Sequence, residues 1–183
     1  SSGGNVVVAA GHGTGAGGNI DIISGGSLSS TGGSVRLIGG TSEANVGGSV
    51  EIVSAGANSV SGSVSFLTGN ADQGQSGAIA VETGDTVANS GSINIQTGES
   101  FEGVGGVISI QGGKSNTATG GSVAVATGSG QVASGSISLM TGASQDTSGD
   151  VSVSTGVGKI NSGSVEISTG NAAEASGSVT ISA

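Results

Sequence analysis

Apolar and polar positions alternate along this chain in short runs that recur at a fixed spacing. The nine residues SGSVEISTG at 162–170 have close copies at 61–69, 90–98 and 134–142. In each copy two apolar residues flank one free position. Strict alternation with β-branched residues predicts a strand with one buried face, whereas a helix needs apolar residues about 3.6 positions apart.

Each run begins at a glycine that returns every 14 or 15 residues, and we number positions within a repeat from this glycine as 0. Thirteen such repeats follow one another without a linker, so the sequence predicts a single continuous domain over 1–183. Because its first and last residues carry the same pattern, we expect a section of a longer chain or filament. The starting glycines are Gly4, Gly18, Gly33, Gly48, Gly62, Gly77, Gly91, Gly106, Gly121, Gly135, Gly149, Gly163 and Gly177.

Positions +2 and +4 are apolar in every repeat, and most are β-branched, while +3 between them varies freely. One such strand of about five residues cannot bury its apolar face alone. Stacking successive repeats would bury it, so we expect positions +2 and +4 to form a thin core. Its representative members are Val64, Phe66, Ile93, Ile95, Val123, Val125, Val165 and Ile167.

Two further columns predict how the chain turns, where a column is one repeat position taken over successive repeats. Position +6 is often Thr and is nearly always followed by Gly, which suggests a corner where that glycine has positive φ. Position +9 is always small, which suggests that it faces the thin core; the extra residue of a 15-residue repeat falls after it. The expected corner ladder consists of Thr68, Thr83, Thr97, Thr127, Thr141, Thr155 and Thr169.

These columns together predict an all-β fold without helices: a single β-solenoid, or β-helix, of about 13 coils with a 14–15-residue repeat and parallel, in-register strands. A barrel or sandwich is the alternative for strands at such spacing. Identical columns over all repeats favour the solenoid, because a barrel does not require the same register in every strand.

Composition narrows the function classes. The chain has 40 Gly, no Cys, Trp, Tyr or Pro, and a mean hydropathy of +0.22. Its charged fraction of 8% argues against the usual disordered composition. A net charge of −9 argues against nucleic-acid partners and anionic membranes, and no apolar run has the length of a membrane span.

No constellation of residues points to catalysis or to a cofactor. His12 is the only histidine and has no acid or nucleophile at a catalytic spacing. Asp recurs at no fixed position, which argues against a calcium-binding roll. The Gly-rich stretch 11–18 lacks the lysine and helix of a phosphate loop. We therefore expect no enzyme activity, no metal site, no cofactor and no catalytic residue.

Two columns are candidates for outward contact. The Thr ladder on a flat Thr/Ser-rich face is typical of ice-binding or surface-binding solenoids, although parity with +2 and +4 places it inward or at a corner. Position +5 is aliphatic in four consecutive repeats and points outward by parity, which marks a possible lateral contact. The alternative is that this column is tucked under a neighbouring coil. Its members are Ile23, Ile38, Val53 and Leu67.

The unit SGSVxIxTG resembles the Gly/Ser/Thr-rich short-repeat β-solenoid proteins of extracellular fibres and surfaces in algae and other microbes. The resemblance covers the whole chain and implies a structural role outside the cell or at its surface. We expect the rigid, rod-like body of a fibre, filament or adhesive stalk, whose partner is another copy joined end to end or laterally. The alternative is a solenoid that binds ice or another surface.

Overall fold

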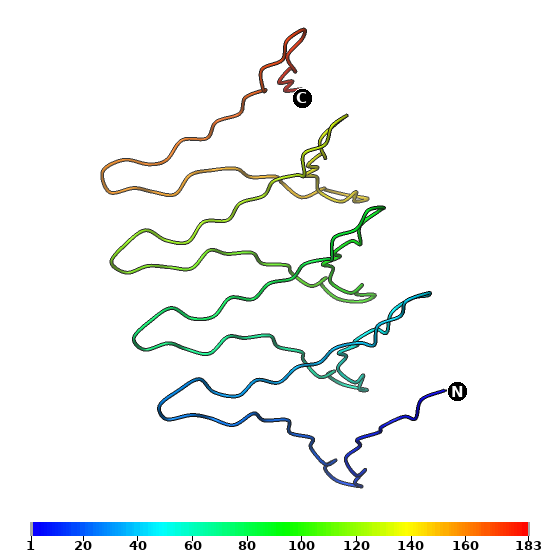
Figure 1. Cartoon of the computed structure of the whole chain (residues 1–183). Coiled ribbons are helices and arrows are strands. Elements are labelled where there is room, and N and C mark those ends of the chain that lie inside the picture. The colour runs from blue at the N-terminus through cyan, green and yellow to red at the C-terminus, as the bar shows by residue number, and fades with distance from the viewer. Residues whose placement is uncertain (1, 183) are drawn as a thin grey trace. The chain divides into compact units, whose positions relative to one another are not determined.

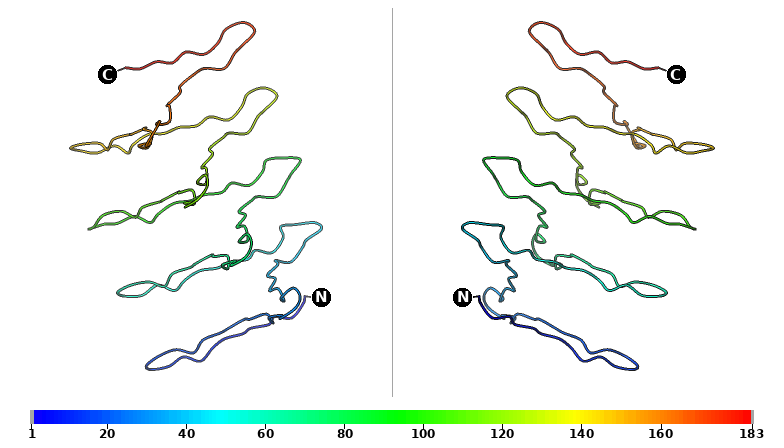
Figure 2. Two further views of the ribbon diagram at one scale, coloured as in Figure 1. Left: turned by 90° about the vertical axis from the view of Figure 1, so that its left-hand side faces the viewer. Right: turned by 90° about the vertical axis from the view of Figure 1, so that its right-hand side faces the viewer.

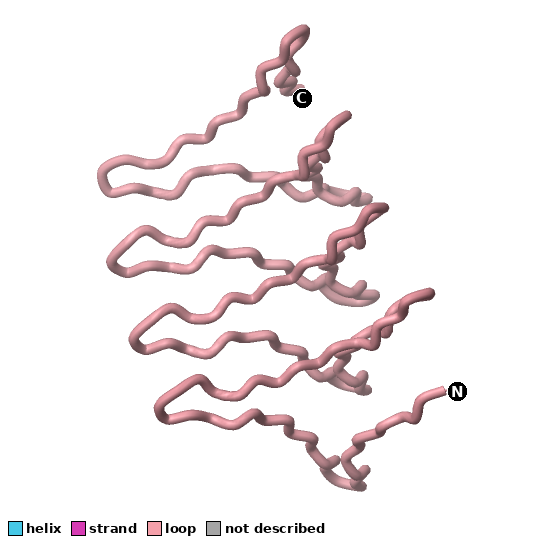
Figure 3. The backbone as a smooth tube through the Cα atoms, viewed as in Figure 1, coloured by secondary structure: helices cyan, strands magenta, loops and turns pink. Residues whose placement is uncertain are grey.

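The chain is extended throughout. In the computed structural model, which describes residues 2–182, no segment of that range forms a helix or a strand (Figures 1 and 3). Two units can be distinguished, Ser1–Ile93 and Asn94–Ala183. In both units long extended stretches alternate with narrow loops in which the chain turns back on itself (Figure 2).

The predicted all-β fold is therefore wrong: residues 2–182 contain no strand, and the chain is neither a β-solenoid nor a β-helix. A solenoid needs hydrogen bonds between equivalent positions of successive coils. The six backbone–backbone bonds of the described residues instead join positions seven or eight residues apart. A folded chain has about one internal hydrogen bond per residue, so six leave most of this backbone to water.

Those six bonds close a loop in each of six repeats. Each runs from the glycine N–H at position 0 to the carbonyl oxygen at +7 of the preceding repeat. The distances are 3.0 Å for Gly18 to Gly11, 2.8 Å for Gly33 to Gly25 and 2.8 Å for Gly121 to Gly113. We call the segment from +7 to the next position 0 the repeat loop. Because these bonds join the two ends of one loop, they do not stack one repeat on the preceding repeat.

Each repeat has one sharp bend, and it lies at the tip of the repeat loop, beginning at position +10. Residues 58–59 form it in one repeat and residues 116–118 in another. The expected corner after the Thr column is absent as a bend, because the backbone runs straight through +6 and +7. No glycine among the described residues has positive φ, so the left-handed corners inferred from the Thr-Gly pairs do not form.

The expected core is not formed either. The eight representative residues of positions +2 and +4 are between 45% exposed (Val64) and 74% exposed (Val125), and no side chain in the described part of the chain is buried. They are Val64, Phe66, Ile93, Ile95, Val123, Val125, Val165 and Ile167. Since coils do not stack, nothing in the chain covers these side chains.

The accessible surface area of the chain can be compared with that of a folded and of an unfolded protein of the same mass. The chain exposes 18254 Å². A folded protein of 16.7 kDa exposes roughly 7,600 Å² and its unfolded chain about 24,000 Å². The single chain therefore withdraws only about a quarter of its surface from water, too little for the burial that stabilises a domain of this length.

We expect the isolated chain to unfold without cooperativity. A packed domain of this length absorbs about 0.7 kcal/mol per residue on melting. Without a core, the dilute chain should show no heat-absorption peak in scanning calorimetry, at a concentration where sedimentation shows a monomer. A sharp transition from a monomer would contradict the open structure.

Candidate functional site

The base of each repeat loop is formed by position +6 and the glycine at position 0 of the next repeat. A β-carbon placed on Gly106 would lie 3.0 Å from Cβ and 3.1 Å from Cγ2 of Thr97, and one on Gly163 would lie 3.5 Å from Cγ2 of Thr155. All seven residues of the predicted Thr ladder face such a glycine: Thr68, Thr83, Thr97, Thr127, Thr141, Thr155 and Thr169. The Thr column thus lies against the glycine that begins the next repeat, eight or nine residues further along the chain.

Two repeats replace this Thr by glycine and bring the two backbones closer together. A β-carbon on Gly39 would collide with the carbonyl oxygen of Gly48, and one on Gly112 with that of Gly121. These loops have two of the shortest closing bonds, 2.8 Å from Gly48 to Gly40 and 2.8 Å from Gly121 to Gly113. Glycine at +6 therefore permits the closest approach of the two backbones, although the closing bond of the loop with Ser24 at +6 is equally short at 2.8 Å.

Position +9 controls the bend at the loop tip rather than facing a core. The Ser27 Oγ accepts from the Ser30 N–H at 3.0 Å, the Ser42 Oγ from the Asn45 N–H at 3.0 Å, and the Ser115 Oγ from the Ala118 N–H at 2.9 Å. Such bonds from a Ser or Thr oxygen to a nearby backbone N–H stabilise turns. The small residues at +9 are selected for turning the chain.

The length of the repeat determines which backbone N–H donates a hydrogen bond to the hydroxyl oxygen at +9. In 15-residue repeats the bond reaches three residues ahead, as from Ser100 to Gly103 at 3.0 Å. In 14-residue repeats it reaches two residues ahead, as from Thr86 to Ala88 at 3.1 Å. The additional residue is taken up at the loop tip, and the loop base keeps the same arrangement.

Glycine at +9 gives the bend another form. A β-carbon on Gly13, Gly130 or Gly158 would collide with the carbonyl oxygen three residues ahead. The backbone oxygen thus occupies the space that a hydroxyl takes in the other repeats. The spacing of Ser, Thr and Gly at +9 was visible in the sequence, and its link to repeat length could have revealed these turns.

The least exposed residues lie at the loop bases and bends. Within residues 2–182 the six least exposed residues all lie at +6 or +9: Gly13, Gly39, Ser54, Thr97, Gly112 and Ser115. None of the apolar residues at +2 and +4 belongs to these six. Packing in this chain is therefore local to each loop.

The extended segment from +1 to +5 is the part of each repeat that remains unpaired. Its apolar side chains at +2 are about half exposed and those at +4 more so. The proposed lateral contact at +5 is exposed by 70% to 87%, so these side chains are not tucked under a neighbour: Ile23, Ile38, Val53 and Leu67. What this column contacts stays a prediction.

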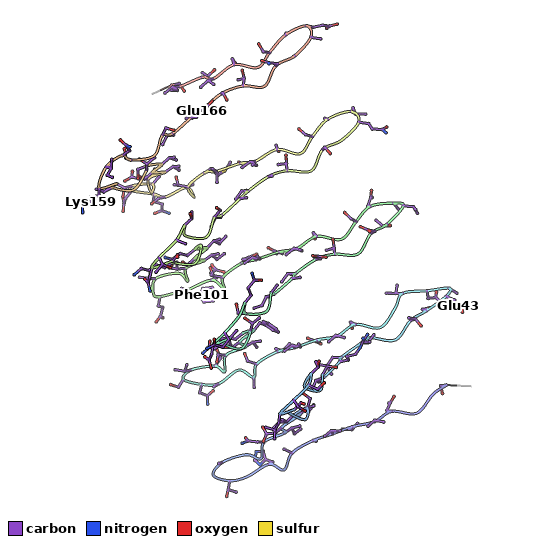
Figure 4. All side chains as sticks on the ribbon, turned by 60° about the vertical axis from the view of Figure 1, so that its left-hand side comes forward. Glu43, Phe101, Lys159 and Glu166 are labelled. Carbon is purple, nitrogen blue, oxygen red and sulfur yellow. The ribbon has the colours of Figure 1, made fainter. Side chains whose placement is uncertain are left out.

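Charged side chains are spread singly along the repeats. Glu43 and Lys159 stand at loop tips and Glu166 on an extended segment, each pointing into open space (Figure 4). No cluster of three His, Cys, Asp or Glu side chains and no pocket occurs within residues 2–182. The same range forms no helix with the length and apolarity needed to cross a bilayer. The candidate functional surface is therefore the set of unpaired extended segments.

Comparison of the chain with models of protein families, with curated proteins and with solved structures finds no match.

We expect Ser115→Ala to loosen one loop tip without affecting the rest of the chain. The substitution removes the acceptor of the Ala118 N–H, a bond worth about 1 kcal/mol or less at an exposed site. The temperature coefficient of the Ala118 amide proton's chemical shift should become more negative and reach the value of a solvated amide. Ser122→Ala, at +1 of the next repeat, is the matched control and should leave Ala118 unchanged.

A second prediction concerns the loop base. A β-carbon at Gly121 would lie 2.9 Å from the backbone nitrogen of Gly113. Gly121→Ala should therefore break the bond to Gly113, and the amide of residue 121 should exchange its hydrogen severalfold faster. Gly135→Ala is the control, because Gly135 also closes its loop, by a 3.1 Å bond to the Gly128 oxygen, and its β-carbon would meet only the Thr127 side chain. It should preserve that bond; equal effects of both substitutions would contradict this role of glycine.

Proposed function

We propose that the chain is a structural protein, the repetitive body of an extracellular fibre, filament or adhesive stalk, and that it works by association between copies. The observation that carries the proposal is the exposure of apolar side chains at +2 and +4 in all thirteen repeats. Apolar surface repeated on this scale marks a contact surface, because water disfavours leaving it exposed.

The backbone supports the same proposal. None of the hydrogen bonds of the described residues involves a backbone group from +1 to +5. An extended segment with free N–H and C=O groups and β-branched side chains is a template for pairing with another chain. Association would satisfy both the apolar and the hydrogen-bonding surfaces.

The Thr column favours the structural proposal over the ice-binding alternative. Ice contact would require Thr side chains arrayed on an open face. In this chain each Thr of the ladder instead lies beside the glycine of a separate loop base, as Thr155 does beside Gly163. The extracellular location is part of the proposal, and it follows from the resemblance to surface-repeat proteins.

The proposal is tested by weakening one extended segment. Val123→Thr with Val125→Thr keeps the shape and β-branching of the side chains but removes apolar surface. We expect the concentration at which the chain associates, measured by sedimentation velocity and checked by electron microscopy, to rise roughly tenfold, which corresponds to about 1.4 kcal/mol.

The matched control is Ala124→Thr at the free position +3, which should leave the association concentration unchanged. A chain that stays monomeric at high concentration would overturn the proposed function. An equal effect of the control would show that the apolar columns do not mediate association.

A further inference from the structure

The six extended segments between Gly62 and Met140 differ from those around them by their lack of charge. Only one charged residue, Glu82, occurs among their positions +1 to +5. The three segments immediately before them carry Asp21, Arg36 and Glu51, and the two immediately after them carry Asp150 and Glu166; only the outermost segments, 5–9 and 178–182, are also uncharged. The other charges of the central region lie in its repeat loops. We call these six segments the central segments: 63–67, 78–82, 92–96, 107–111, 122–126 and 136–140.

From this pattern we infer that the central segments bind a second copy of this chain, paired parallel and in register. The inference rests on the proposed function and names the partner and the pairing. Short segments with high β-propensity, low charge and no proline are the sequences that pair in this way.

Identical residues meet in the parallel, in-register arrangement, and in the central segments every such pair except Glu82 on Glu82 is uncharged. Apolar +2 faces +2 and apolar +4 faces +4 in every segment. Asn94, Gln96 and Gln111 would form amide ladders, which stabilise stacked chains. In the flanking segments the same arrangement places Asp21 on Asp21 and Glu51 on Glu51, and like charges directly opposite oppose pairing. Pairing is therefore strongest in the centre.

The order of repeat lengths selects this register over the alternatives. From Gly62 to Gly135 the spacings are 15, 14, 15, 15 and 14 residues. This order changes when it is reversed or shifted by one repeat. Since 14- and 15-residue repeats differ in their loop tips, the parallel, in-register arrangement sets every central tip beside a tip of the same form, whereas a shift by one repeat or an antiparallel pairing of the central segments with each other does not.

The surface available is sufficient for a partner of this size. With roughly 60 Å² of apolar surface left on each half-exposed Val or Ile, the two columns of six segments offer on the order of 700 Å² per copy. A standard interface buries about 800 Å² per partner. Because the segments are tandem, each pairing raises the effective concentration of the next.

The absence of cysteine from the chain permits a direct test, since any introduced cysteine is unique. The full chain is prepared as three variants: Ser63→Cys, Leu67→Cys and Ala78→Cys. Each must first sediment like the unmodified chain under reducing conditions. Paired mixtures, with one partner labelled with nitrogen-15, are then assembled and mildly oxidised, and the covalent dimers are identified by intact mass.

We expect disulfide dimers of Ser63→Cys with itself, because in-register strands place equivalent Cα atoms about 4.8 Å apart, within the range for a disulfide. Dimers mainly between Ser63→Cys and Leu67→Cys would indicate antiparallel pairing, and those between Ser63→Cys and Ala78→Cys a shift by one repeat. Either result, or assemblies without disulfides, overturns the inference and leaves the proposed function standing. Failure of the unmodified chain to assemble overturns both.

Discussion

The contact between the glycine at position 0 and the residue at +6 of the preceding repeat organises this chain. It needs no side chain on the glycine, and Thr97 against Gly106 shows how little space separates the two. Because the contact joins residues only eight or nine apart, its cost in chain entropy is small compared with that of contacts between distant residues. Each repeat can thus close its loop without help from another repeat.

Local closure determines what remains for contact with other molecules. Glycine and Thr residues lie at the base of the loop, and the bend at its tip is stabilised by hydroxyl groups such as that of Ser115. The Val and Ile residues between loops obtain no partner from this arrangement, and Val64 remains 45% exposed. Some polar groups of the loops are satisfied locally, whereas the backbone groups and apolar side chains of the extended segments are left for interactions between chains.

Sequence reasoning predicted the repeat well and its three-dimensional arrangement poorly. The period, the extended segment from +1 to +5 and the variable stretch after +9 are all visible in the letters. Alternation such as Val165, Glu166, Ile167 indicates that one face favours burial, but it does not say whether a neighbouring repeat or another chain provides the cover. The solenoid prediction assumed the first.

The candidate site shows the same limit. The +5 column, including Ile38, is exposed, but so are the +4 residues that parity placed inward, so its exposure does not test the parity argument. The role of Ser27 and its equivalents was mistaken because a small residue suits both a thin core and a turn, and only the position of the Ser30 N–H distinguishes them. Likewise, Gly after Thr suggested a left-handed corner, but no described glycine has positive φ, and a β-carbon on Gly98 or Gly156 would meet nothing within 4 Å; the close approach occurs at the glycine of position 0.

The loop tip also bears on how such a chain can change over generations. Since Ser100 and Thr86 shape tips that differ by one residue while the loop bases stay alike, the gain or loss of a single codon at the tip leaves every other column in phase. The loop tip is thus a place in the repeat where a change of one residue in length preserves the loop base, and the mixture of 14- and 15-residue repeats fits this tolerance.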